Sequence, residues 1–139
     1  LGVVPIVNEN DAVSVDELKD AVNTFGDNDT LSAIVAAIVS ADILVLLTDI
    51  DGLYDKNPRD SADAVKIDEV FEIDEKIEKY AGGIGSQRGT GGMKTKISAA
   101  RYATERGIAV AVVSGEEPKN LYGVFDGENP GTLFHPKRG

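Results

Sequence analysis

The stretch that decides how this chain folds is GTGGMKTK, which runs from Gly89 to Lys96. Glycine has no Cβ atom, so the backbone N–H groups of this stretch can close around a ligand. The residues that follow predict a helix, and the first turn of a helix carries partial positive charge. These properties together are typical of a loop that holds phosphate groups. The stretch therefore predicts a nucleotide site.

A flexible linker is the alternative interpretation, because glycines also crowd residues 82–89. The sequence after the glycines argues against it. Apolar residues recur at helical spacing from Met93 to Ala103, the pattern ends at Gly107, and an apolar run of strand length follows. A loop, a helix and a strand in this order are the usual setting of a phosphate site in α/β proteins.

Two common nucleotide fingerprints are missing. No glycine is directly followed by lysine, so the chain has no GxxxxGK[ST] sequence, and no GxGxxG register fits between Gly82 and Gly92. The sequence therefore argues against a P-loop enzyme and against a dinucleotide-binding fold.

The composition limits the class of protein. The 139 residues suffice for one domain, and without cysteine they form neither a disulfide nor a thiolate metal site. The single histidine, His135, cannot make a zinc site by itself. The longest apolar run, Ala33 to Val39, is far shorter than the roughly 18 residues of a membrane span. We therefore expect a cytoplasmic protein that does not bind a membrane.

The net charge of −10 argues against nucleic-acid binding, which requires a basic surface. An acidic protein that binds an anionic nucleotide has to concentrate its cations locally. Arg88, Lys94 and Lys96 lie within nine residues of one another around the glycines. Their position supports the phosphate interpretation.

Three apolar runs have the length of strands, at Val3–Val7, Ile43–Leu47 and Ile108–Val113. Near-continuous valine, isoleucine and leucine indicates strands that are covered on both faces, as in a parallel sheet. Pro5 is the weak point of the first run, because proline is disfavoured in a central strand.

A helix is predicted at Thr30–Ala41, between the first two runs, with Asn28 or Asp29 as its cap. A strand, a helix and a strand in sequence favour a right-handed crossover unit. Ligands of open parallel sheets bind beyond the carboxyl ends of the strands. The polar groups at 8–11 and 48–49 follow two of these ends, so we expect them to face one crevice with the glycine loop.

The remaining segments are assigned more coarsely. We expect an exposed excursion at 12–25, a surface loop at 55–68, a helix at Glu69–Tyr80, a short helix at Asn120–Phe125 and a strand at Gly131–Phe134. None of these segments repeats another.

Five ordered motifs carry a resemblance to a known family. They are PIVNEND at 5–11, FGDND at 25–29, LLTDIDGLY at 46–54, GTGGMKTK at 89–96 and GTLF at 131–134. In order and spacing the set resembles the amino acid kinase family, and within it the γ-glutamyl kinases. The resemblance covers essentially the whole chain, but only the carboxyl-terminal part of the family's kinase domain.

The resemblance implies a fold. It makes residues 1–139 the nucleotide-binding part of a single amino acid kinase domain, without the RNA-binding-like domain that some members append. The implied architecture is α/β, a three-layer αβα sandwich with a mainly parallel sheet that is incomplete at its N-terminus.

The resemblance also implies a reaction, the transfer of the γ-phosphoryl group of ATP, with Mg²⁺, to the side-chain carboxylate of L-glutamate in proline synthesis. It assigns Lys96 and Asp29 to catalysis, and Asp11 and Asn28 to glutamate binding. The residues assigned to the nucleotide are Thr48, Asp49, Thr90, Gly91, Gly92, Met93, Lys94, Thr95 and Lys96. No residue stands out as a direct magnesium ligand.

These implied roles fit the chemistry. A glutamate side chain with a pKa of about 4.3 is already ionised at neutral pH, so the nucleophile needs no general base. The site has to align two anions and neutralise charge on the transferred group. Asp29 is therefore better suited to orienting a lysine or magnesium than to accepting a proton.

The sequence departs from the family at its beginning. The family also uses an amino-terminal Gly-x-Lys-x-Gly lysine that meets the γ-phosphate and a further loop that helps hold the phosphates or glutamate, and Leu1 comes after both. We therefore expect this polypeptide alone to have little or no kinase activity. The resemblance further implies homo-oligomers and hand-over of the product to glutamate 5-phosphate reductase.

Two other functions remain open. One is a family member with another acceptor, such as acetylglutamate, aspartate, carbamate or uridylate. The other is a nucleotide-binding module without catalysis.

Overall fold

The structure is a computed structural model that describes residues 2–7, 28–82 and 90–137. Its helices are α2 (Asn28–Ile38), α3 (Glu75–Gly82), α4 (Thr90–Thr104) and α5 (Lys119–Phe125). Its strands are β1 (Ile43–Thr48), β2 (Leu53–Tyr54), β3 (Lys66–Ile67), β4 (Glu69–Val70), β5 (Ala109–Ser114) and β6 (Thr132–Phe134). Within the described ranges, no helix is long and apolar enough to cross a bilayer.

The main sheet has four strands in the order β1-β5-β6-β4. β1 and β5 run parallel, from Ile43 opposite Ala109 to Thr48 opposite Ser114. β4 is parallel to β6, whereas β5 and β6 are antiparallel. Two of the three pairings are thus parallel, which confirms the prediction of an α/β fold with a mainly parallel sheet. β2 and β3 form a separate antiparallel hairpin.

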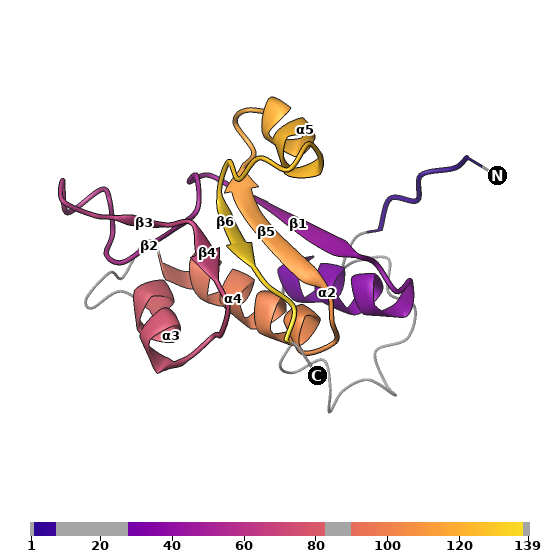
Figure 1. Ribbon diagram of the computed structural model, residues 1–139, viewed down its shortest axis with the longest axis horizontal. Helices are drawn as coiled ribbons and strands as arrows, with labels where there is room; N and C mark the ends of the chain where they lie inside the picture. The colour runs from indigo at the N-terminus through magenta and orange to yellow at the C-terminus, as the bar shows by residue number, and fades with distance from the viewer. Residues whose placement is uncertain (1, 8–27, 83–89, 138–139) are drawn as a thin grey trace.

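The core forms where α4 packs on β5. Ala99, Ala100 and Ala103 of α4 are completely buried, and so are Val110 and Val112 of β5. Because alanine has no side-chain atoms beyond Cβ, the helix can approach the strand closely. α2 lies beside α4 (Figure 1) and adds its own buried alanines to the same cluster.

The predicted order of helix and strand is confirmed around α4. The helix ends at Thr104, and Gly107 follows with a φ of 81°, which glycine adopts without strain. The amide of Ile108 donates to the carbonyl of Ala103 at 3.1 Å, and the chain turns directly into β5. A helix of 15 residues and a strand of 6 have similar lengths, roughly 20 Å. The first turn of α4 therefore lies near the carboxyl end of β5.

A buried threonine joins the hairpin to the main sheet. The hydroxyl of Thr132, on β6, accepts from the amide of Leu53 at 2.7 Å and donates to the carbonyl of Ile67 at 2.6 Å. A Cβ on Gly52 would lie 2.7 Å from the Thr132 hydroxyl oxygen, and a Cβ on Gly131 only 2.0 Å from a backbone oxygen of β5. Only glycine therefore fits at positions 52 and 131, next to the contact between the hairpin and the main sheet. This accounts for the glycine in the motif LLTDIDGLY and for the glycine in the motif GTLF.

The predicted strand at Val3–Val7 is wrong. Residues 2–7 form no regular structure, and Val4 and Ile6 are 85% and 93% exposed. Figure 1 shows this segment, in indigo, extending away from the sheet. A strand needs a neighbouring edge for its N–H and C=O groups, and no backbone hydrogen bond joins this segment to another described residue. Pro5 removes one of the donors that such pairing needs.

The predicted helix at Glu69–Tyr80 is wrong in its first half. Val70 pairs with Phe134 in the parallel β4–β6 ladder, so the backbone there is extended. Asp74 then caps α3, since its Oδ1 accepts from the amides of Lys76 at 3.0 Å and Ile77 at 2.9 Å. A tertiary contact with a strand far along the chain overrides the local helical pattern.

The helix predicted at Thr30–Ala41 is α2, with shifted ends. It begins at Asn28, so the two predicted capping residues lie inside its first turn. It ends at Ile38, and Ser40 follows with a φ of 53°, which a helix cannot continue through. Asp29 therefore lies where the helix dipole favours a carboxylate.

The other segments mostly follow the prediction. The loop predicted at 55–68 contains β3, because Ile67 pairs with Leu53. The short helix and the last strand are confirmed as α5 and β6. The excursion predicted at 12–25 lies outside the described residues.

Candidate active site

Two strand ends and two helix beginnings meet at one edge of the sheet. β1 and β5 finish side by side at Thr48 and Ser114, because they are parallel and in register. α4 begins near the end of β5, and α2 packs against α4 with Asp29 in contact with Lys96. Ligands of open α/β sheets bind beyond the carboxyl ends of the strands. This edge is therefore the candidate active site.

An ion pair joins α2 to α4 at this edge. The ammonium of Lys96 donates to both carboxylate oxygens of Asp29, at 3.2 Å to Oδ1 and 3.0 Å to Oδ2. The side chains of Lys96 and Asp29 are only 12% and 20% exposed. Removing either partner would leave a poorly solvated charge. The pair therefore holds an ammonium in a defined place at the edge of the sheet.

A hydroxyl on α4 also contacts this carboxylate. Thr95 donates to Oδ2 of Asp29 at 2.8 Å, and its hydroxyl oxygen also lies 2.9 Å from the carbonyl oxygen of Gly92. Ser32 donates to the backbone carbonyl of Asp29 at 2.6 Å. The carboxylate of Asp29 thus accepts hydrogen bonds on both of its oxygens, and it fixes the direction of the Lys96 side chain.

The carboxylate of Asp49 lies directly after β1. Oδ2 accepts from Nη2 of Arg59 at 2.9 Å, and Oδ1 accepts from the hydroxyl of Thr48 at 3.2 Å. The hydrogen bond from Arg59, and after it that from Thr48, lowers the pKa of Asp49 below its ordinary value of 3.8. Asp49 and Arg59 are 72% and 67% exposed. This carboxylate therefore faces solvent, unlike that of Asp29.

Arg59 is the residue of this edge that sequence reasoning missed. It belongs to the segment predicted as a surface loop, and it follows Asp49 by ten positions. That separation alone says nothing about contact. The loop between β2 and β3 folds back toward the end of β1 and brings the two side chains together. Local sequence patterns do not encode the path of this loop.

The other residues assigned to the nucleotide lie along the first turns of α4. Thr90 and Gly91 open the helix, and Lys94 is exposed on it. Met93 is partly buried and packs against the core cluster. Asn28, assigned to glutamate, is exposed at the start of α2.

The structure brings only part of the predicted site into contact. Asp29, Thr95 and Lys96 form one cluster, and Thr48 and Asp49 form another. Among the described residues, no hydrogen bond or ion pair links the two clusters. Two further residues of the predicted site lie outside the described residues. They are Asp11, assigned to glutamate, and the cation Arg88.

The carboxylates at this edge are the groups that could bind a magnesium ion. In the part of the chain that the structure describes, no three histidine, aspartate or glutamate side chains come together as a metal site. Asp29 and Asp49 both direct their oxygens at protein donors. Mg²⁺ in kinase sites keeps several waters and is held by substrate phosphates with one or two carboxylates. A magnesium ion held in that way would need only one or two carboxylates, and Asp29 and Asp49 are the carboxylates placed at this edge.

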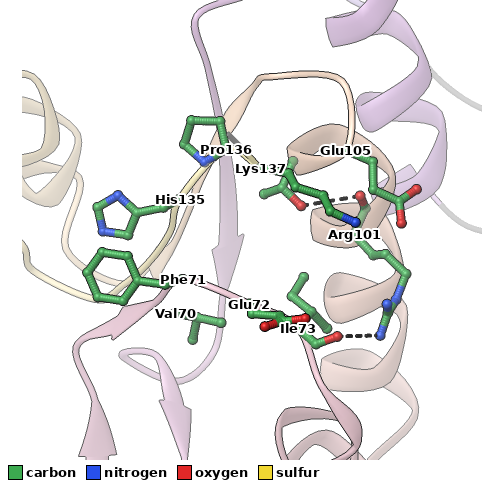
Figure 2. Close-up of a pocket in the computed structure, with 10 residues that line it drawn as sticks. Val70, Phe71, Glu72, Ile73, Arg101, Glu105, His135, Pro136 and Lys137 are labelled. Atoms are coloured by element: carbon green, nitrogen blue, oxygen red, sulfur yellow. Dashed lines mark hydrogen bonds between the residues drawn. The ribbon is translucent and has the colours of Figure 1, made fainter. Parts of the chain in front are cut away.

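A separate cleft of about 610 Å³ lies at the opposite end of the sheet, beside the last turns of α4. Figure 2 shows Phe71 stacked on His135, with ring centroids 4.3 Å apart, and Arg101 donating to the backbone carbonyl of Ile73. The cleft is lined by Val70, Phe71, Glu72, Ile73, Arg101, Thr104, Glu105, His135, Pro136 and Lys137. It contains none of the predicted site residues.

Comparison with known proteins identifies the family. A sequence profile described as the amino acid kinase family matches residues 1–114. The chain therefore belongs to the amino acid kinase family, and the predicted resemblance is confirmed.

Its curated relatives include the glutamate 5-kinase of Clostridium perfringens, which is 54% identical over 99% of this chain and 51% of the relative. The glutamate 5-kinase of Listeria monocytogenes is 50% identical over 99% of this chain and 49% of the relative. That of Carboxydothermus hydrogenoformans is 53% identical over 99% of this chain and 35% of the relative. The chain thus spans about half, or less, of the length of these relatives.

Solved structures share the fold at low identity. UMP kinase from Bacillus anthracis superposes with a TM-score of 0.61 at 16% identity, over 82% of this chain and 42% of that chain. An isopentenyl phosphate kinase product complex from T. acidophilum gives 0.57 at 22% identity, over 77% and 38%. At these identities the likeness establishes the fold alone.

Proposed function

We propose that this chain is the nucleotide-binding part of a glutamate 5-kinase, within a single amino acid kinase domain. The reaction transfers the γ-phosphoryl group of ATP to the side-chain carboxylate of L-glutamate and forms L-glutamate 5-phosphate, the first step of proline biosynthesis. The observation that carries the proposal is the Asp29–Lys96 pair, held where α2 meets the glycine-rich beginning of α4. The identities of 54% and 50% to glutamate 5-kinases over nearly the whole chain support glutamate as the acceptor.

The chemistry needs positioning and charge rather than proton transfer. A carboxylate oxygen of glutamate attacks the γ-phosphorus, the bond from that phosphorus to the bridging oxygen breaks, and ADP leaves with the electron pair. Because the glutamate side chain is ionised at neutral pH, no protein group has to remove a proton. Asp29, with donors on both oxygens, is consistent with a site that contains no general base.

Lys96 is the group that meets the transferred phosphoryl. Negative charge spreads over the equatorial oxygens of that group during transfer, and a preorganised cation lowers the barrier most where water is excluded. The side chain of Lys96 is only 12% exposed, and its ammonium is 3.0 Å from the carboxylate of Asp29. In this proposal Asp29 sets the position of Lys96, and Thr95 sets the orientation of Asp29.

The remaining assignments complete the proposed site. Asp11 and Asn28 bind the amino and carboxylate groups of glutamate, and Thr48 and Asp49 contact the nucleotide. The backbone N–H groups at the beginning of α4 hold the phosphates. Magnesium bound to those phosphates neutralises part of their charge.

The wider setting of the enzyme is also part of the proposal. UMP kinase and isopentenyl phosphate kinase share this fold, so the fold leaves the acceptor open, and the sequence identities support glutamate. We place the enzyme in the cytoplasm, as a homo-oligomer that passes its reactive acyl phosphate to glutamate 5-phosphate reductase.

The test is formation of γ-glutamyl hydroxamate from glutamate, hydroxylamine and Mg-ATP. It compares this chain alone with a chimera in which the chain replaces the matching part of the Clostridium perfringens relative. We expect turnover in the chimera only, and a loss of about a hundredfold or more with Lys96→Ala. Lys79→Ala, at an exposed position of α3, is the matched control and should retain activity.

Two results would contradict the proposal. A chimera that binds ATP but forms no hydroxamate rules out glutamate, and the same assay with acetylglutamate or aspartate, or phosphorylation of UMP, then identifies another acceptor. Normal activity of Lys96→Ala removes this lysine from the mechanism.

A further inference from the structure

The β2–β3 hairpin brings a cation to the candidate active site that has no role in the proposed mechanism. Arg59 lies in the loop between the two strands, and its Nη2 donates to Oδ2 of Asp49 at 2.9 Å. Asp49 directly follows β1, at the edge where the strands end. A guanidinium from a distant loop is thus held at the proposed nucleotide site.

The loop positions Arg59 through its own hydrogen bonds. The side-chain oxygen of Asn57 accepts from the amide of Arg59 at 3.1 Å. The backbone carbonyl of Asn57 accepts from the amides of Asp60 and Ser61 at 3.1 and 3.0 Å. The position of Arg59 is therefore set by a turn as well as by its ion pair.

An uncompensated carboxylate at this position would oppose nucleotide binding. Asp49 is 72% exposed, and a carboxyl with an ordinary pKa of 3.8 is ionised at neutral pH. ATP carries several negative charges, and charges closer than the Debye length of about 8 Å still act on each other at physiological salt. A carboxylate that contacts the nucleotide therefore needs its charge cancelled nearby.

We propose that Arg59 is a positioning residue of the nucleotide site, which cancels the charge of Asp49 and holds its carboxylate against Thr48 so that the polyphosphate can approach. This inference rests on the proposed function, because it requires a nucleotide at this edge. It assigns the hairpin a role in ligand binding.

The same loop offers a matched control. Lys56 donates to Asp63 at 2.6 Å, and both side chains are exposed. Neither residue belongs to the candidate active site. Lys56→Gln therefore removes one positive charge from the same loop, as Arg59→Gln does, but leaves the partner of Asp49 in place.

The experiment measures the affinities of the full chain for ATP and for adenosine by titration calorimetry. We expect Arg59→Gln to weaken ATP binding by about threefold to tenfold, and more at low ionic strength. Adenosine has no phosphate, so its affinity should change by less than about twofold. Arg59→Lys should retain most of the ATP affinity, and Lys56→Gln should leave both affinities unchanged.

A double-mutant cycle separates charge cancellation from a merely structural role. In an Asp49→Asn background, Arg59→Gln should change ATP affinity by less than about twofold, because no charge is left to cancel. Unchanged ATP affinity in Arg59→Gln would overturn the inference and leave the proposed function intact. Equal losses for ATP and adenosine would also overturn it. If neither the wild-type chain nor the chimera binds ATP, the proposed function fails and the inference fails with it.

Discussion

Two carboxylate–cation pairs, Asp29–Lys96 and Asp49–Arg59, lie in opposite environments. The first joins two helices and its side chains are 20% and 12% exposed, whereas the second joins a strand end to a hairpin loop at 72% and 67%. A shielded pair leaves a costly charge behind when one partner is removed, while an exposed pair contributes little to stability. We therefore expect the first pair to affect both stability and phosphoryl transfer, and the second to affect mainly ligand binding.

The largest expected effect tests the shielded pair. Asp29→Ala should lower the free energy of unfolding by about 3 kcal/mol, because it leaves the ammonium of Lys96 with little solvent and no partner. Urea denaturation of the two chains measures the difference. Asp42→Ala, at an exposed aspartate just before β1, is the control and should be near neutral. Equal effects of the two substitutions would show that the Asp29–Lys96 pair does not contribute to stability through its burial.

A smaller loss is expected when the hairpin is detached from the sheet. Thr132→Val keeps the shape of a fully buried side chain but leaves the amide of Leu53 and the carbonyl of Ile67 without their partner, which should cost about 2 kcal/mol. Hydrogen exchange at the Leu53 amide should accelerate. Thr132→Ser keeps the hydroxyl and should exchange more slowly than Thr132→Val. If exchange is the same in all three chains, this bond does not anchor the hairpin that carries Arg59.

Removing the exposed pair Asp49–Arg59 should change the pKa of Asp49 more clearly than it changes the free energy of unfolding. Arg59→Gln should lower the free energy of unfolding by about 0.5 kcal/mol or less. In the wild type, Asp49 has a lowered pKa, so its contribution is present above 3.8 and is lost as the pH falls through the lower folded value. The substitution should raise the pKa of Asp49 toward 3.8, which a carboxyl ¹³C titration by NMR measures. A pKa that does not move would show that the pair is not formed in solution.

The smallest effect is expected at the pair that lies outside the site. Lys56→Gln should leave the urea midpoint unchanged, because Lys56 and Asp63 are solvated with or without each other. The pKa of Asp63, which the hydrogen bond from Lys56 lowers, should rise toward its ordinary value. A clear shift of the urea midpoint would mean that exposure is a poor guide to the energetics of this hairpin.

The sequence predicted what local chemistry encodes. The glycine-rich beginning of α4, its apolar spacing and the turn at Gly107 depend on neighbouring residues, so the helix and β5 were predictable. Only the family resemblance indicated that Asp29 and Lys96 act together. Nothing in the spacing of residues 29 and 96 indicates contact.

What the sequence did not predict depends on distant partners. β4 has only two residues and pairs with β6, whereas the local pattern of its residues predicts the beginning of a helix. The segment at 3–7 has the composition of a strand, but composition does not provide the edge that a strand needs. The contact between Arg59 and Asp49 depends on the path of the loop between β2 and β3, which no local pattern encodes.

The alanine-lined contact between α4 and β5 has a consequence for how precisely Lys96 is placed. Ala99, Ala100 and Ala103 have no side-chain torsion to rearrange, so these three residues have no alternative rotamers and lose no side-chain entropy on folding. Lys96 is therefore carried by a helix whose alanine contacts with β5 cannot rearrange through side-chain rotation. Thermal motion inside the core therefore has few ways to change where the ammonium of Lys96 points.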